Sequence, residues 1–177
     1  MKTKDMEAVF STGKDDWGTP MLLFKKLHDE FNFCVDVCAE ENNALLDQYI
    51  SSDKDALKTN WDSHCSIPHA ASRYYIHNFY MNPPYSNVAL FMERMAKESL
   101  SNKHNRYVAL VASRTDTRWF HDWVLPIASE IRFIKGRLSF AGALSTAPFP
   151  SLVVVYNTAT SSRVDGYGPK ITSWSPR

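Results

Sequence analysis

Apolar residues in the first third of the chain form a helical stripe followed by a short continuous run. The stripe recurs every three or four residues, as on one face of an amphipathic helix, and consists of Leu23, Phe24, Leu27 and Phe31. Thr19 is a favourable N-cap and Pro20 a favourable first helical residue, so we expect the helix to begin there. The run FNFCVDVCA then predicts a short buried strand that ends near Asp36. Residues 40–58 are expected to form an acidic helix, and residues 59–77 an irregular connection.

The rest of the chain repeats this alternation of strands and helices. Four more strands are predicted from the apolar runs NFYM, RYVALVA, IRFI and LVVVY, which begin at residues 78, 106, 131 and 152. A helix with an exposed i,i+4 pair of Glu93 and Lys97 is predicted from the stripe Val88, Phe91, Met92 and Met95. Another is predicted from the stripe Trp119, Phe120, Trp123, Val124, Ile127 and Ala128. This spacing favours a core position for both tryptophans over a role as stacking platforms.

Helices that alternate with nearly continuous apolar strands are typical of an α/β protein. We therefore expect a single domain with a mostly parallel central sheet and helices on both faces. A chain of 177 residues is long enough to bury one sizeable core. Residues 1–16 are polar and are expected to be a flexible N-terminal segment, and residues 17–156 the folded domain. Residues 157–177 are rich in Ser, Thr, Gly and Pro, which predicts a polar, flexible tail.

Charge and hydropathy add expectations about location and partners. No apolar run approaches membrane-spanning length and the first residues lack the apolar centre of a signal peptide, so a cytoplasmic protein with no membrane partner is expected. The net charge is only +1, but residues 28–62 hold nine acids against two lysines. Residues 101–140 hold seven bases against three acids. This asymmetry fits one face for a polyanion and another for a cationic ligand; two solvated faces explain it equally well.

Two absences restrict the chemistry. The three cysteines, Cys34, Cys38 and Cys65, form no CxxC pair, and the stretch HCSIPH has no second ligand pair nearby, so no metal is expected. The chain contains no glycine between Gly18 and Gly136. A P-loop and a GxGxxG fingerprint are therefore excluded from the central sheet, which weighs against NAD or ATP as a cofactor.

The strand NFYM runs directly into Asn82, Pro83, Pro84 and Tyr85, and this turn is a candidate for chemistry. Prolines donate no ladder hydrogen bonds, so the strand must end here, and ligands of open α/β sheets bind at such carboxyl ends. The Asn82 oxygen and a main-chain carbonyl of the prolines are rigid acceptors for an exocyclic amine. Tyr85 offers a face on which a flat base can stack. A rigid structural turn with a packed tyrosine explains the four residues equally well on their own.

Four further stretches of sequence lie before and after this turn. They are DDWGTP at 15–20, SRTDTRWFH at 113–121, KGRLSF at 135–140 and APFPS at 147–151. Together with NPPYSN they closely resemble the phage-type DNA adenine-N6 methyltransferases, the Dam-like family of phages and prophages. The resemblance spans residues 15–156. It implies a Rossmann-like methyltransferase fold, S-adenosylmethionine as methyl donor, and an adenine flipped out of double-stranded DNA as acceptor.

The resemblance also implies roles for individual residues. The catalytic element consists of Asn82, Pro83, Pro84 and Tyr85. The implied cofactor-binding residues are Trp17, Thr19 and Pro20 at the methionine end, Asp36 near the amino group, Ala39 in the adjoining loop, and Asp55 near the adenine amine. The implied DNA-facing residues are Arg114, Asp116, Thr117, Arg118 and Arg137. Sequence recognition is expected from short loops at 60–77 and 138–150.

The sequence departs from the general methyltransferase pattern after the first strand. A glycine-bearing loop normally follows there, whereas this chain continues DVCAEEN, in which only Ala39 is small enough for close backbone approach. Asp36 and Asp55 can also be interpreted as helix caps or as part of a solvated acidic face.

Other functions remain open at this stage. Similar NPPY sites methylate RNA or a protein glutamine, and the chain can also be a degenerate DNA-binding protein that no longer holds the donor. The sequence leaves open whether the protein is a monomer or a weak dimer. It also leaves open whether methylation evades restriction or regulates phage genes.

Overall fold

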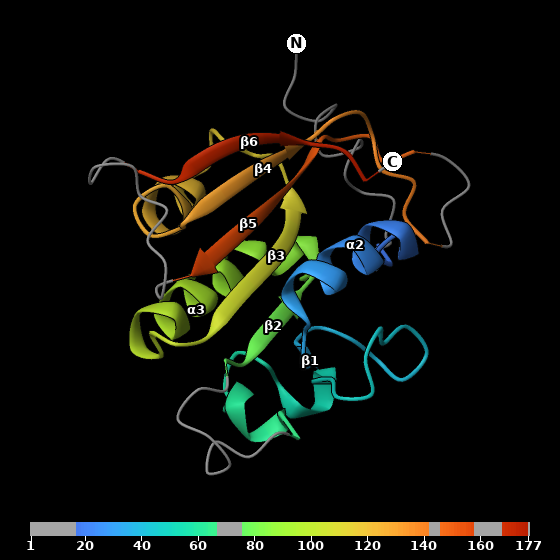
Figure 1. The fold of residues 1–177 in the computed structure, drawn as a ribbon, viewed down its shortest axis with the longest axis vertical. Coiled ribbons are helices and arrows are strands. Elements are labelled where there is room, and N and C mark those ends of the chain that lie inside the picture. Colours follow the sequence, from blue (N-terminus) through green and yellow to red (C-terminus); the bar gives the residue numbers. More distant parts are fainter. Residues whose placement is uncertain (1–16, 67–75, 142–145, 158–167, 177) are drawn as a thin grey trace.

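The computed structural model describes residues 17–66, 76–141, 146–157 and 168–176, and Figure 1 shows the arrangement of the elements. Their bounds in chain order are α2 Met21–Phe31, β1 Val35–Asp36, η1 Ser52–Lys54, η2 Trp61–His64, β2 Asn78–Met81, η4 Tyr85–Asn87, α3 Val88–Ser101, β3 Arg106–Ala112, η5 Phe120–Val124, β4 Glu130–Ile134, β5 Ser151–Asn157 and β6 Lys170–Trp174. The strands predicted from the apolar runs are all present, so the predicted α/β class is confirmed.

The described strands form one six-stranded sheet in the order β1-β2-β3-β5-β4-β6. β1, β2 and β3 pair in parallel, as do β4 and β6, whereas β5 is antiparallel to both of its neighbours. The sheet is therefore mixed, and the prediction of a mostly parallel sheet is met only in part. The reversal arises because β5 follows β4 in the chain and also pairs with it, and such neighbours need no helical crossover.

Alternate side chains of the central strands enter two separate cores, one on each face of the sheet. Phe79 and Met81 of β2 point to the face covered by α3 and η5, while Tyr80 between them points to the face covered by α2. Figure 1 shows α2 and α3 on opposite sides of the sheet. The predicted helices on both faces are thus present, and the domain has the layers expected of a Rossmann-like fold.

The acidic helix predicted for residues 40–58 is wrong. Polar side chains bind the backbone of this segment instead: Asn43 Oδ1 accepts from the Glu40 N–H at 2.7 Å, and Glu40 Oε1 accepts from the Ser52 N–H at 2.9 Å. Such side-chain bonds compete with helical ones. Tyr49 forms a parallel bridge with Asp36, so the segment extends the sheet beside β1 rather than packing on it as a helix.

The predicted helix around Trp119 and Trp123 is short and of π type, since η5 spans Phe120–Val124 and the turn after it contains Pro126, which has no N–H to donate. Trp119 is buried and Trp123 half-buried, and both pack with the core on the α3 face, as predicted.

The predicted flexible tail after residue 156 is corrected at two places. Asn157 is the last residue of β5, and Lys170–Trp174 form β6, which pairs with β4 over five positions. The Ser, Thr, Gly and Pro content predicted a flexible tail, but residues 170–174 pair with the edge of β4. The predicted N-terminal segment, residues 1–16, lies outside the described residues. Among the described helices, none is long and apolar enough to cross a membrane.

Candidate active site

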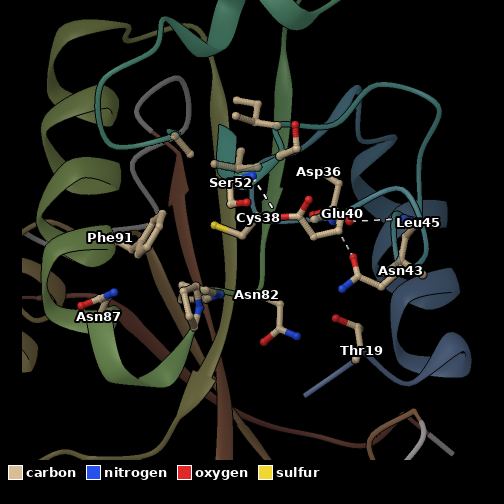
Figure 2. A pocket seen from close by; sticks show the side chains of 18 of the residues that line it. Thr19, Asp36, Cys38, Glu40, Asn43, Leu45, Ser52, Asn82, Asn87 and Phe91 are labelled. Atoms are coloured by element: carbon tan, nitrogen blue, oxygen red, sulfur yellow. Dashed lines mark hydrogen bonds between the residues drawn. The ribbon is translucent and has the colours of Figure 1, made fainter. Parts of the chain in front are cut away.

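A cavity of about 340 Å³ lies at the carboxyl ends of β1 and β2. Its walls come from three segments: residues 17–19 before α2, residues 36–57 after β1, and residues 82–91 after β2. Asn82 and Thr19 lie toward one end of the cavity, and Glu40 and Ser52 toward the other (Figure 2). This is the edge at which ligands of open α/β sheets bind, and it is where the sequence placed the NPPY turn.

Asn82 stands immediately after β2 and lines the cavity. Its Nδ2 donates to the main-chain oxygen of Trp17 at 2.6 Å. Its Oδ1 is buried and has no hydrogen-bond partner among the described residues. Because a buried unpaired oxygen is costly, the site is built for a ligand that brings an N–H or O–H donor.

Pro83 and Pro84 also line the cavity, but Tyr85 is not among the lining residues. The Tyr85 ring packs edge-on against Phe149, with centroids 5.0 Å apart, and its hydroxyl is buried without a partner among the described residues. Burial raises the pKa of Tyr85, so the phenol stays protonated. Tyr85 in this conformation is therefore a packed tyrosine, which the sequence alone had left as an alternative to stacking.

The segment before α2 supplies Trp17 and Thr19 to the cavity, as predicted, but not Pro20. The Thr19 hydroxyl is 2.8 Å from the hydroxyl of buried Tyr80, which fixes the segment to β2. Pro20 is the N-cap of α2, one residue later than expected, and its carbonyl accepts from the Phe24 N–H at 3.0 Å. Pro20 thus acts on the site by starting the helix.

Asp36 ends β1 and lines the cavity with only 3% of its surface exposed. Its Oδ2 accepts from the Leu45 N–H at 3.3 Å, and its Oδ1 is buried without a partner among the described residues. Burial raises the pKa of Asp36 to about 6, against the opposing effect of backbone N–H groups. Asp36 is therefore neither a helix cap nor a solvated acid. A buried carboxylate with an open oxygen suits a cationic ligand group.

The cavity lining also includes polar residues that were not predicted from the sequence, among them Glu40, Asn43 and Ser52. They lie in the segment that had been assigned to an acidic helix, where nothing distinguished Glu40 from a surface acid. Ala39 lines the cavity too, as its small size had suggested, and is buried. The glycine-poor loop after β1 thus still forms a wall of the cavity.

Asp55 lines the cavity and adopts a left-handed conformation, with φ of 51°. Its carboxylate already has partners, since it accepts from the Leu57 N–H at 3.1 Å and lies 2.6 Å from Lys58 Nζ. The Lys58 ammonium, the main cause, lowers the pKa of Asp55. In contrast to Asp36, Asp55 offers no unpaired buried oxygen.

The wall that includes Ala56 and Leu57 is held from behind by two long side chains. Arg94 of α3 donates to the carbonyl oxygens of Leu57 and Thr59 at 2.5 and 2.9 Å. The Trp61 indole donates to the carbonyl of Ala56 at 2.7 Å. α3, the helix that follows the NPPY turn, is thereby attached to the cavity wall that includes Ala56 and Leu57.

The residues predicted to face DNA lie outside the cavity lining. Arg114, Asp116, Thr117 and Arg118 follow β3, and Arg137 follows β4, so all of them lie at the same sheet edge as Asn82. The four charged residues are exposed. Thr117 Oγ1 donates to the Arg114 carbonyl at 2.7 Å, which closes a turn, and Arg118 pairs with Asp122 at 3.0 Å. The predicted recognition loops, 60–77 and 138–150, are described only in part.

No group of three or more potential metal ligands occurs in the described part of the chain. His69 of the HCSIPH stretch lies outside the described residues.

Comparison with known proteins adds two findings. A family model described as DNA N-6-adenine-methyltransferase (Dam) matches residues 7–164. The DNA N-6-adenine-methyltransferase of Haemophilus phage HP1 (strain HP1c1) is 32% identical over 131 residues, which is 72% of this chain and 66% of that relative. The chain thus matches just under two thirds of the length of this relative.

Proposed function

The chain belongs to the Dam family of DNA N-6-adenine-methyltransferases, and from this premise we propose that it transfers the methyl group of S-adenosylmethionine to N6 of adenine in double-stranded DNA. The observation that carries the proposal is the amide of Asn82, whose Oδ1 is buried, unpaired within the described residues, and part of the cavity lining. The relative in phage HP1 bears the name of the same activity.

The chemistry of adenine explains why such an oxygen is needed. The lone pair of N6 is delocalised into the ring, so the amine is a poor nucleophile until its nitrogen becomes pyramidal. Asn82 Oδ1 and a carbonyl of the Pro83–Pro84 turn accept the two N6 hydrogens and hold the nitrogen in that geometry. The methylated nitrogen carries a positive charge and releases its proton to water, so no strong base is required.

The cavity fits S-adenosylmethionine on the evidence of Asp36. When bound, the cofactor supplies an electrophilic methyl group on a sulfonium. The open oxygen of Asp36 would pair with the ammonium of the bound cofactor, and Trp17, Thr19 and Asn82 line the same cavity. The small side chain of Ala39 would allow this wall of the cavity to approach the cofactor closely.

The far end of the cavity suits the nucleoside of the cofactor. Glu40 and Ser52 lie there (Figure 2), and Asp55 also lines the cavity. The Asp55 carboxylate already accepts from the Leu57 N–H and pairs with Lys58. It can therefore bind the adenine amine of the cofactor only through an oxygen that already has a partner. Pro20 contributes by fixing where α2 begins.

Adenine N6 is out of reach inside a duplex, so the target base flips out of the helix into the site. Arg114, Arg118 and Arg137 follow strands at the sheet edge on which the cavity lies, and they contact DNA phosphates. Asp116 and Thr117 shape the turn that carries Arg114 and Arg118. Tyr85 stacks on the flipped base after a rotation away from Phe149.

A labelled-methyl assay with duplex DNA, RNA and protein as acceptors tests the proposal. The expected result is label in DNA, recovered as N6-methyladenine, and loss of transfer in Asn82→Ala with fold and cofactor binding retained. Label in RNA or in protein glutamine alone would assign the other acceptors. No saturable binding of S-adenosylmethionine by calorimetry would instead point to a degenerate DNA-binding protein.

A further inference from the structure

We propose that Trp17 is a positioning residue, whose main-chain carbonyl sets the amide of Asn82 so that its oxygen faces the substrate amine. The proposal rests on the function proposed above and adds a requirement to it. The geometry of the acceptor depends on how the segment before α2 docks against the chain beyond β4. Residues 17 and 18 therefore act on the reaction through Asn82.

The chemistry of the contact determines which group of Asn82 faces Trp17. A carbonyl oxygen only accepts hydrogen bonds, so the group of Asn82 that lies 2.6 Å from Trp17 must be its NH₂. The amide is planar, and fixing its nitrogen fixes its oxygen on the opposite side. In the opposite orientation two oxygens would face each other and the NH₂ would meet the substrate amine. The contact with Trp17 thus decides whether Asn82 presents an acceptor or a donor.

Contacts of Trp17 and Gly18 hold the Trp17 carbonyl in place. Gly18 forms an antiparallel β-bridge with Ala141, and the Ala141 N–H donates to the Gly18 carbonyl at 2.7 Å. The Trp17 ring packs edge-on against Phe140 and Phe149, with centroids 5.5 and 5.8 Å away. All three contacts come from the chain between β4 and β5.

Gly18 allows this docking because it has no side chain. A Cβ at Gly18 would lie 3.1 Å from the Cβ of Ala141, closer than such atoms normally approach. Replacing Gly18 by alanine therefore pushes the two backbones apart by a few tenths of an ångström, and the carbonyl of Trp17 moves with them.

The contact with Trp17 also distinguishes asparagine from aspartate at position 82. An aspartate at position 82 offers acceptor oxygens of the same kind, but its carboxylate would also face the Trp17 carbonyl with no hydrogen to donate. The two oxygens would repel each other, and the carboxylate would turn from its productive orientation. In this chain the NH₂ of Asn82 is as necessary as its oxygen.

A set of four proteins tests the docking: wild type, Gly18→Ala, Ala141→Gly, and the double variant. Single-turnover methyl transfer at saturating cofactor and DNA is expected to fall about tenfold in Gly18→Ala, the effect of a misplaced positioning hydrogen bond. Ala141→Gly is the reference for the double variant, which is expected to recover most of the rate of that reference because the clashing methyl is gone. Dissociation constants for cofactor and DNA are measured in parallel, so that a slower rate at saturation is separated from weaker binding.

Asn82→Asp tests the requirement for the NH₂ group, and its rate in the same assay is expected to be at least tenfold lower than that of the wild type. Full activity of Asn82→Asp, or of Gly18→Ala, would overturn the proposal. So would a Gly18→Ala defect that Ala141→Gly does not relieve, since the added methyl would then act in the cavity itself.

A spectroscopic readout separates this proposal from the proposed function. The side-chain NH₂ of Asn82, assigned by NMR through its loss in Asn82→Ala, is expected to exchange slowly with solvent in the wild type and rapidly in Gly18→Ala. This holds whether or not the wild type methylates DNA. Rapid exchange in both proteins would refute the contact, whereas an inactive wild type with slow exchange would refute only the methyl transfer.

Discussion

Asp36 and Asn82 face one cavity from the carboxyl ends of two adjacent parallel strands. Asp36 is in register with Tyr80, so Asn82 lies two residues further along the neighbouring strand. Each has one buried oxygen without a partner among the described residues. Two open acceptors in one cavity are complementary to two donors, an ammonium at Asp36 and an amine at Asn82, and the two roles make different predictions.

Cofactor affinity is expected to fall as pH is lowered through about 6, the pKa of Asp36 in the ligand-free protein. Below this pH the carboxyl is protonated and no longer attracts an ammonium. Asp36→Asn is expected to bind S-adenosylmethionine about tenfold more weakly at pH 7.5 and to show little change between pH 7.5 and 5. Calorimetric titrations at several pH values measure both proteins. A wild-type affinity that is constant over this range would contradict the pairing.

The carboxyl of Asp36 is expected to affect the stability of the ligand-free protein in the opposite direction, so that stability falls as pH rises. Its pKa is raised from 3.8 to about 6 on folding, so the folded protein favours the protonated form. The free energy of unfolding of the ligand-free protein should therefore fall as pH rises from about 4 to above 6, by about 2–3 kcal/mol at most. Asp36→Asn removes this cost, so it should be more stable than wild type at pH 7.5 and similar at pH 4. Urea titrations check this, and a variant less stable at pH 7.5 would contradict it.

The strands and the NPPY turn were predictable because their signals are local. Apolar runs such as RYVALVA have no alternative to burial, and prolines after Asn82 end a strand wherever they occur. The position of Asp36 at a strand end followed from the same run. The family resemblance then brought the segment at Trp17 to the same site, which no local pattern indicates.

The parts that were missed depend on contacts between distant residues. Residues 40–58 have helical composition, but bonds such as Glu40 to Ser52 and the bridge of Tyr49 to Asp36 exist only after β1 has folded. β6 has an ordinary polar sequence, and only the open edge of β4 gives it a strand conformation. The packing of Tyr85 on Phe149 joins segments that no sequence spacing connects.

Arg94→Lys is expected to weaken cofactor binding about three- to tenfold while changing the rate at saturating cofactor less than twofold. Lysine keeps the charge beside Glu98 but cannot reach the carbonyls of Leu57 and Thr59 with one planar group. The wall at Ala56 and Leu57 therefore loosens. Calorimetry and hydrogen exchange of residues 56–59 measure the effect.

Lys97→Ala is the matched control for this variant, because Lys97 lies one turn further along α3 and forms an exposed pair with Glu93 at 2.6 Å. Its affinity for the cofactor should stay at the wild-type value. An equal loss of cofactor affinity in both variants would mean that α3 as a whole had changed, and not only the hydrogen bonds from Arg94 to Leu57 and Thr59.

Arg114→Ala and Arg137→Ala are each expected to weaken DNA binding and to reduce the slope of log affinity against log salt by about one. Both arginines follow strands at the sheet edge that holds the cavity. Lys103→Ala is the control, since Lys103 lies between α3 and β3, at the opposite edge. Fluorescence anisotropy with one duplex at several salt concentrations gives the slopes. A change of slope for Lys103→Ala and none for the arginines would place the DNA on the other edge.

Removal of residues 168–177 is expected to lower the free energy of unfolding by about 2–5 kcal/mol and to promote aggregation. β6 pairs with β4 over five positions, and its flanks are fixed where the Lys170 N–H donates to Ser129 and the Lys135 N–H to Trp174, each at 2.9 Å. Without β6 the Ser129 carbonyl and the Lys135 N–H lose their partners, and the edge of β4, with exposed Phe133, is open to another chain. Removal of residues 176 and 177 alone leaves the strand intact and should change stability by less than about 0.5 kcal/mol. Thermal and urea unfolding with light scattering distinguish the two truncations. If the longer truncation were as stable and as soluble as the shorter one, the strand would be the dispensable tail that its composition predicts.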